Sequence, residues 1–240
     1  MDVLDPDRDL RLLSSACYRG DGAEVVRVLA GRDPGLLLQQ AGEGIVVALI
    51  AGTTGAETIA QDLIGRLAAR GWDGDAELAE QLTAMTGGPP TGRRAAPAEL
   101  DELADLLEGG LEHGFGGLLD LTTGACWPEA VIDDWDGDEE DAPRPDLDPD
   151  RWLGVPNYGS QDGWRDMADF IGTLDDQAVA DRLTDAIDGR GAFSRFRREL
   201  DRRPELISRW QAFSAECRVG RARSWLASSG YDALPATRGR

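Results

Sequence analysis

The stretch DAIDGRGAFSRFRRELDRRPELISRWQAF, residues 185–213, has the clearest helical periodicity in the chain. Three apolar side chains recur at helical spacing, which places them on one face of a helix. Three arginines recur at the same spacing on the opposite face. The apolar set is Phe193, Phe196 and Leu200, and the arginine set is Arg195, Arg198 and Arg202. The pattern predicts an amphipathic helix with one face in a core.

A second helix is expected to follow at once. Pro204 suits a first helical turn, because its missing N–H has no partner there anyway. Gly189 is expected to end the helix that precedes Phe193, at a position where a residue with positive φ is needed. The apolar face of the second helix contains Leu206, Trp210, Phe213 and Cys217. This periodicity predicts that Trp210 is buried.

The arginines allow two interpretations. In the first, they form a solvated helix face with no specific role. In the second, Arg190, Arg195, Arg198 and Arg202 form a binding site for phosphates or for an acidic partner, since a guanidinium pairs with either group.

Outward from this stretch, the preceding residues change from helical to extended patterns. Residues 118–132 predict a β-hairpin whose turn uses a positive φ at Gly124. Residues 151–156 predict a third strand. Residues 162–173 predict a helix with inward side chains Trp164, Met167, Phe170 and Ile171, and Asp175 is the expected cap of the next helix.

The N-terminal part predicts helices alone. Residues 8–85 contain several apolar periodic segments, one of them capped by Asp75. Residues 87–97 have the composition of a linker, so trypsin is expected to cleave near Arg93 and Arg94. The predicted organisation is a helical domain over 1–86, a linker over 87–97, an α+β domain over 98–231 and a tail over 232–240. The fold class is therefore α+β and mostly α, with a small antiparallel sheet and four C-terminal helices.

The charge of the chain is negative and unevenly distributed. The formal net charge is −20 over 240 residues. Residues 99–150 contain 18 acidic residues and one arginine, a net charge of −17. Residues 151–240 contain 13 acidic residues and 15 arginines, a net charge of +2. Such an acidic chain is not expected to bind nucleic acid or anionic membranes non-specifically.

Residue types needed for several chemistries are scarce. The chain has no lysine, which excludes a Walker A lysine and Schiff-base catalysis. The single histidine, His113, lies in a glycine-rich stretch with no evident nucleophile nearby. The acidic residues of 133–150 depart from a calcium-binding loop at the sixth position, Glu139, and the twelfth, Pro145. We therefore expect no metal and no cofactor.

The sequence also bears on the compartment. Three widely spaced cysteines, Cys17, Cys126 and Cys217, fit thiols in a reducing cytoplasm. The acidic N-terminus does not resemble a signal peptide, and no apolar run is long enough to span a membrane. A cytoplasmic protein without membrane contact is expected.

Six segments of the C-terminal part resemble the bacterial uncharacterised-protein family numbered 0158. They are LDLTTGACWPEAVI (119–132), RWLGVP (151–156), DMADFI (166–171), DAIDGRGAFSRFRREL (185–200), RWQAF (209–213) and ARSWLASSGY (222–231). The resemblance extends over about residues 99–230. Ser194 departs from it, because the resemblance implies a basic residue there. Since the activity of this family is unassigned, the resemblance implies no catalytic residues.

Three functions are compatible with these observations. The first is a non-enzymatic cytoplasmic binding or regulatory protein that acts through protein–protein contacts. The second is a nucleic-acid-associated protein that uses the C-terminal arginine face. The third is a hydrolase built on carboxylates, although no single carboxylate pair stands out among so many.

Overall fold

The computed structural model describes residues 2–5, 8–109, 116–133, 148, 150–159 and 161–236. The helices are α1 (Arg8–Tyr18), α2 (Gly22–Leu29), α3 (Leu38–Ile50), α4 (Ala56–Arg70), α5 (Asp75–Met85), α6 (Leu100–Glu108), α7 (Glu129–Asp133), α8 (Gln161–Gly172), α9 (Gln177–Ile187), α10 (Ala192–Leu200) and α11 (Pro204–Ser228). The strands are β1 (Asp2–Val3), β2 (Arg32–Asp33), β3 (Arg94–Pro97), β4 (Gly117–Asp120), β5 (Cys126–Pro128), β6 (Trp152–Val155) and β7 (Tyr231–Leu234). The predicted mostly α, α+β class is confirmed.

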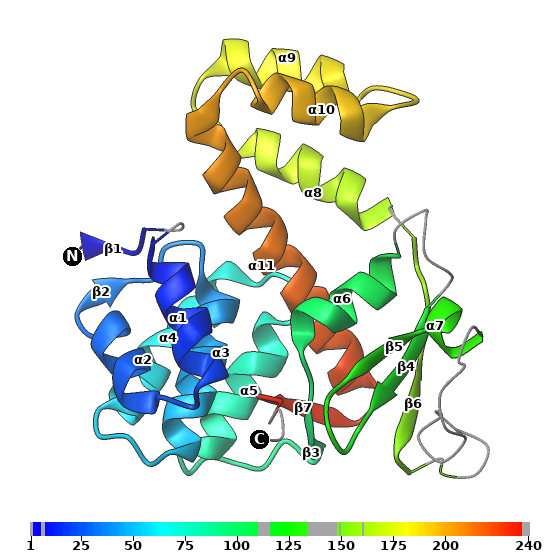
Figure 1. The fold of residues 1–240 in the computed structure, drawn as a ribbon. Coiled ribbons are helices and arrows are strands. Elements are labelled where there is room, and N and C mark those ends of the chain that lie inside the picture. Colours follow the sequence, from blue (N-terminus) through cyan, green and yellow to red (C-terminus); the bar gives the residue numbers. More distant parts are fainter. Residues whose placement is uncertain are drawn as a thin grey trace.

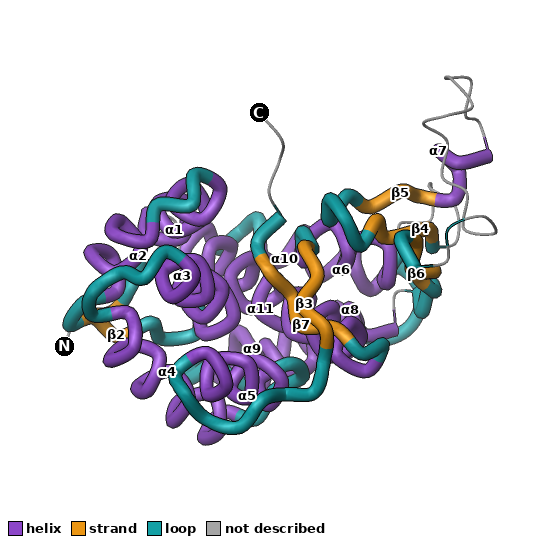
Figure 2. The backbone as a smooth tube through the Cα atoms, turned by 90° about the horizontal axis from the view of Figure 1, so that it is seen from below, coloured by secondary structure: helices purple, strands orange, loops and turns teal. Residues whose placement is uncertain are grey.

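The long helix α11 lies at the centre of the molecule (Figure 1). The helices α1 to α5 lie on one side of it, α6 and the three-stranded sheet lie on the other, and α8 to α10 surround its N-terminal end. Seen from below, β3 and β7 lie between the N-terminal helices and that sheet (Figure 2). At 25 residues, α11 is about 37 Å long, which lets one helix reach all three parts.

Side chains of α11 enter three hydrophobic cores. Ala212 packs in the core of the N-terminal helices, Phe213 in the core of α8 to α10, and Leu226 in the core formed with α6 and the sheet. Because α11 meets neighbours on several sides, it has no single apolar face along its length. The two predicted domains therefore share a helix, and their independent folding stays a prediction.

The small sheet has the order β5-β4-β6, and both pairings are antiparallel. The predicted hairpin and third strand are confirmed, as is the positive φ of Gly124, which is 83°. The second arm of the hairpin is shorter than predicted, since Glu129–Asp133 form α7. The hairpin turn is held by the buried carboxylate of Asp120, which accepts from the backbone N–H of Thr122 at 2.8 Å.

The linker predicted over 87–97 and the tail predicted over 232–240 contain ordered strands. Arg94–Pro97 form β3, which pairs in parallel with β7, Tyr231–Leu234. Arg93, predicted to be exposed to trypsin, forms ion pairs with Glu80 and Asp232. The linker prediction is wrong for these residues, because a four-residue strand shows no periodicity and its partner lies over 130 residues away.

Several predicted helix ends need correction. Pro204 begins α11 as expected, and Gly189, with a φ of 72°, follows α9. The cap of α9 is Asp176, whose side chain accepts from the N–H of Val179 at 3.1 Å, and not Asp175. Asp75 is the first residue of α5, while Gly74 occupies the cap position. The carboxylate of Asp75 has another role, described below.

Trp210 lies partly buried among aromatic rings of three helices. Its ring centroid is 4.9 Å from that of Phe196, 5.3 Å from that of Phe170 and 6.3 Å from that of Phe213. By contrast Trp164, which was predicted to face inward, is 46% exposed, and its indole N–H donates to the carbonyl of Ile187 at 3.0 Å.

Trp210→Ala is expected to lower the free energy of unfolding by about 3 kcal/mol, because it removes a large ring from this aromatic cluster. Trp164→Ala is the matched control and is expected to cost about 1 kcal/mol, the usual value of one hydrogen bond. Urea unfolding of the full chain measures both. Equal losses in the two variants would contradict the assignment of Trp210 to the core.

Two sequence-based predictions lie outside the described residues. They are the absence of a nucleophile near His113 and the departure of the acidic stretch from a calcium-binding loop, since His113 and residues 134–147 and 149 are not described. Within the described ranges, no helix is both long enough and apolar enough to cross a membrane.

Candidate functional site

The predicted arginine site does not form one continuous surface. Arg195 turns back on the chain, where its Nε donates to the carbonyl of Ala186 at 2.9 Å. Its other nitrogens donate to the carbonyls of Asp188 and Arg190. Arg195 therefore satisfies the C-terminal end of α9, whose last carbonyls have no partner within the helix.

The other three predicted residues keep exposed side chains. Arg202, in the turn after α10, pairs with Glu199 of α10 at 2.6 Å. Arg190 lies in the turn before α10 and Arg198 lies on α10, and both are exposed. Arg197, which did not belong to the predicted set, is also exposed and lines a groove.

This groove lies between α8, α10 and α11 and has a volume of about 460 Å³. Its apolar lining consists of Phe193, Phe196, Leu200, Ile207 and Trp210. Its polar lining consists of Glu108, Asp166, Arg197, Asp201, Gln211 and Ser214. The remaining lining residue is Gly163. The floor is thus an extension of the aromatic core of α8 to α11.

Phe193 stands at the edge of the groove and is 47% exposed, although its spacing predicted a core position. A Cβ atom added at Gly163 would lie 3.2 Å from Cε1 of the Phe193 ring, so this ring packs over the glycine of α8. Phe193, Arg197 and Asp201 also line an adjoining hollow of about 300 Å³, together with Ser194 and Arg198. These three residues therefore form a ridge between two depressions.

The charges around the groove differ in how they are paired. Arg221 donates to Asp166 at 2.8 Å through both terminal nitrogens and to Glu108 at 2.5 Å. Although burial opposes it, these two carboxylates hold the pKa of Arg221 above its usual range. Among the described residues, Arg197 and Arg198 have no ion-pair partner. The carboxylates of Glu108 and Asp166 are therefore neutralised by arginines, while Arg197 and Arg198 keep an unbalanced positive charge.

A further depression, of about 270 Å³, is lined by residues of α1, α3 and α11. Residues at the start of α6 and just after β7 complete its lining. Three carboxylates line it: Glu43, Glu99 and Asp101. Burial raises the pKa of Glu43 to about 7; nearby Arg223 opposes this shift, while Asp101, Glu99 and Glu216 add to it. Within the described residues, no three potential ligand side chains converge as a metal site would require.

The raised pKa of Glu43 predicts a pH-dependent stability. The folded state holds a proton on this group up to about pH 7, whereas the unfolded chain releases it near 4.5. Stability from this group is therefore lost as pH rises between these values, by about 3 kcal/mol in total. Glu43→Gln should stabilise the protein by about 2–3 kcal/mol at pH 8 and little at pH 4.5.

Urea unfolding at the two pH values measures this difference. Glu57→Gln, at an exposed position of α4, is the control and should have no such pH-dependent gain. If Glu43→Gln shifted stability equally at both pH values, ionisation of Glu43 would not be the cause.

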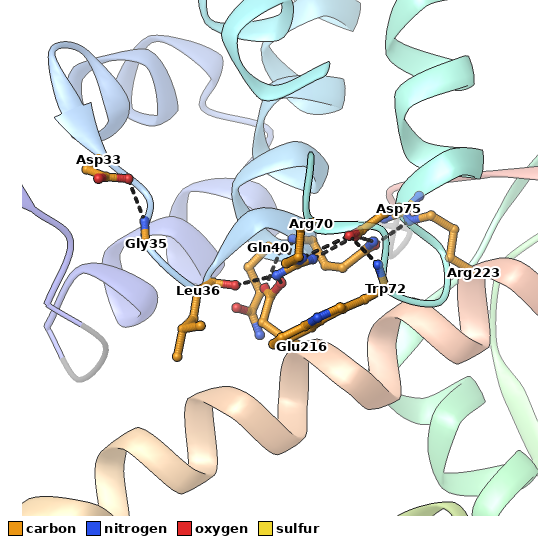
Figure 3. Close-up of polar contacts among 10 residues, drawn as sticks. Asp33, Gly35, Leu36, Gln40, Arg70, Trp72, Asp75, Glu216 and Arg223 are labelled. Atoms are coloured by element: carbon orange, nitrogen blue, oxygen red, sulfur yellow. Dashed lines mark hydrogen bonds and ion pairs between the residues drawn. The ribbon is translucent and has the colours of Figure 1, made fainter. Parts of the chain in front are cut away.

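A buried polar network joins the N-terminal helices to α11 (Figure 3). Arg70 of α4 donates to Asp75 at 2.7 Å and to Glu216 of α11 at 2.9 Å. Gln39 of α3 donates its backbone N–H to Glu216 and its amide to Asp75, both at 2.8 Å. Arg223 donates to Gln39 at 2.8 Å. The cluster contains two arginines and two carboxylates, so their charges balance. Because it links α3 and α4 to α11, it is a structural junction.

Nothing in the sequence singled out this network. Asp75 was assigned to a helix cap, and Glu216 and Arg223 were two charged residues among many on a periodic helix. One local feature indicated that Glu216 and Arg223 share a buried face. They are seven residues apart on a helix whose neighbouring positions are apolar. The partners of Glu216 lie 146 and 177 residues away, which no local pattern can indicate.

The comparisons with known proteins give one match. Residues 130–235 match the model of the Uncharacterised protein family (UPF0158), which confirms the resemblance over these residues. The matched range includes α8 to α11 and hence every lining residue of the groove except Glu108, and it begins later than the predicted 99. No curated protein matches the chain. No solved structure matches it either.

Proposed function

We propose that this chain is a non-enzymatic binding protein that docks a partner protein in the groove between α8, α10 and α11. The exposed ring of Phe193 beside a hollow of about 460 Å³ is the observation that supports it. Aromatic side chains next to a preformed hollow are the typical anchors of protein interfaces. The proposal places the protein in the cytoplasm, as its free thiols suggest.

The rigidity of the floor favours this function. Phe196 and Trp210, which line the groove, are held by edge-to-face contacts within the core of α8 to α11. A partner that binds there need not order these side chains first, and so avoids part of the entropic cost of association. A preformed apolar floor with one exposed ring at its rim suits the insertion of a few apolar side chains.

Photo-crosslinking in the cells that produce the protein tests this proposal. A benzophenone amino acid replaces Phe193 in one variant and Ile50, an exposed residue of α3, in another. We expect one dominant cross-linked protein at position 193 that is absent at position 50. The same protein, once purified, should bind the wild-type chain and bind Phe193→Ala at least about tenfold more weakly. Identical products at both positions, or none at 193, would contradict the proposal.

A carboxylate-based hydrolase is the second candidate, and one observation favours it. Glu43 has a pKa of about 7 and shares a depression with two further carboxylates. A carboxyl group that titrates near neutrality is suited to general acid–base catalysis. Chromogenic ester, glycoside and phosphodiester substrates test this candidate. A turnover abolished in Glu43→Gln would support it, and no turnover above that of this variant would exclude it for those classes.

A further inference from the structure

We propose that the segment docked in the groove presents apolar side chains to Phe193 and Trp210 and a carboxylate to Arg197 and Arg198. This inference rests on the proposed function and specifies the chemistry of the partner. It is an acidic, apolar protein segment, and neither a basic segment nor a nucleic acid.

Two of the three carboxylates that line the groove, those of Glu108 and Asp166, are already bound by arginines of the protein. Glu108 accepts from Arg221 at 2.5 Å and from Arg218 at 2.9 Å. Asp166, which is 3% exposed, accepts from Arg221 through both carboxylate oxygens. A basic partner segment would have to displace these arginines, and would leave them buried without partners.

The basic groups at the rim are free to bind. Arg197 and Arg198 are exposed neighbours on α10, and within the described part of the chain neither is ion-paired. Arg197 lines the groove, and Arg198 lines the adjoining hollow. Glu199, the next residue in sequence, already pairs with Arg202, whereas Asp201 lines both the groove and the hollow. Two guanidinium groups against one carboxylate leave a local positive charge. A partner carboxylate placed beside the apolar anchors complements it.

The net charge of −20 would slow the approach of an acidic partner but does not decide the contact. Exposed charges more than about 8 Å apart are largely screened at physiological salt. A carboxylate placed beside Arg197, which lines both the groove and the adjoining hollow, therefore interacts mainly with Arg197 and Arg198. A nucleic acid, by contrast, has charge along its whole length and meets the −17 segment wherever it extends within that distance.

A selection from a displayed library of random 16-residue peptides tests the inference, with the full-length protein as target at 0.15 M NaCl. We expect enriched peptides to combine apolar residues with Asp or Glu. The affinity of the best synthetic peptide should fall about tenfold in Arg197→Gln/Arg198→Gln, the usual value of two exposed charge pairs. It should fall further in Phe193→Ala. The control Arg11→Gln/Arg182→Gln removes the same charge from exposed positions of α1 and α9, and should change affinity less than twofold.

The outcomes separate this inference from the proposed function. Peptides that depend on Phe193 but lack an excess of acids, or that bind Arg197→Gln/Arg198→Gln unchanged, would overturn the inference and leave the docking function standing. No enriched peptide, or none that depends on Phe193, would overturn both. A labelled 20-nucleotide single strand that bound at the same salt and was lost in the arginine variant would also overturn both, in favour of nucleic-acid binding.

Discussion

Glu216→Ala is expected to lower the free energy of unfolding by about 3–5 kcal/mol, the usual cost of removing one partner of a buried ion pair. The side chain is 1% exposed and accepts from Arg70 and from the backbone N–H groups of Gln39 and Gln40. Its removal leaves three donors of the N-terminal helices without an acceptor. A buried donor that has lost its acceptor keeps its full desolvation cost, and this cost lowers the free energy of unfolding.

Urea unfolding of the full chain measures this loss, and Glu205→Ala is the control. Glu205 lies in the first turn of the same helix but is exposed, so its removal should cost less than about 0.5 kcal/mol. Equal small losses in Glu216→Ala and Glu205→Ala would show that the junction contributes little.

Gly220→Ala is expected to destabilise the protein by about 3 kcal/mol or more, although alanine is the better helix former. A Cβ atom at position 220 would lie 2.1 Å from the carbonyl oxygen of Asp73, a backbone atom that cannot rotate away. In the reverse direction, a Cβ at Gly74 would lie 2.2 Å from the carbonyl oxygen of Gly220. The helix α11 and the turn before α5 therefore meet backbone to backbone.

Gly65→Ala in α4 is the matched control. Gly65 is an exposed helical glycine with open space around its added Cβ atom, so alanine should stabilise by up to about 1 kcal/mol. The two substitutions are chemically identical and differ in the sign of their expected effect. Thermal and urea unfolding measure both, and stabilisation by Gly220→Ala would refute the close contact of the two backbones.

The sequence by itself determined the local structure of the chain. Apolar periodicity predicted α8, α9 and α10, and the turn at Gly124 predicted the hairpin, because these features depend on residues a few positions apart. The six segments of the C-terminal part determined the family resemblance. The mostly α, α+β class followed from the same local signals.

The groove was only partly predictable. The spacing of Phe193 and Phe196 correctly placed both on one face of α10, but predicted that both would be buried. Phe196 is buried, whereas Phe193, whose ring packs over Gly163 of α8, stays 47% exposed at the rim. Arg195 matched the arginine pattern, yet its guanidinium donates to carbonyls at the end of α9 and is not available to a partner. A helical pattern defines a face, and the neighbouring helices decide how much of that face is covered.

Only the tertiary structure decided the central position of α11, the pairing of β3 with β7 and the network around Glu216. Each joins residues more than 130 positions apart: Arg94 with Tyr231, Gln39 with Glu216, and Gly74 with Gly220. A short strand, a buried charge and a helical glycine have no local pattern that differs from their exposed counterparts. Their environments exist only after the helices pack, since the partners are brought together by burial of three cores around one helix.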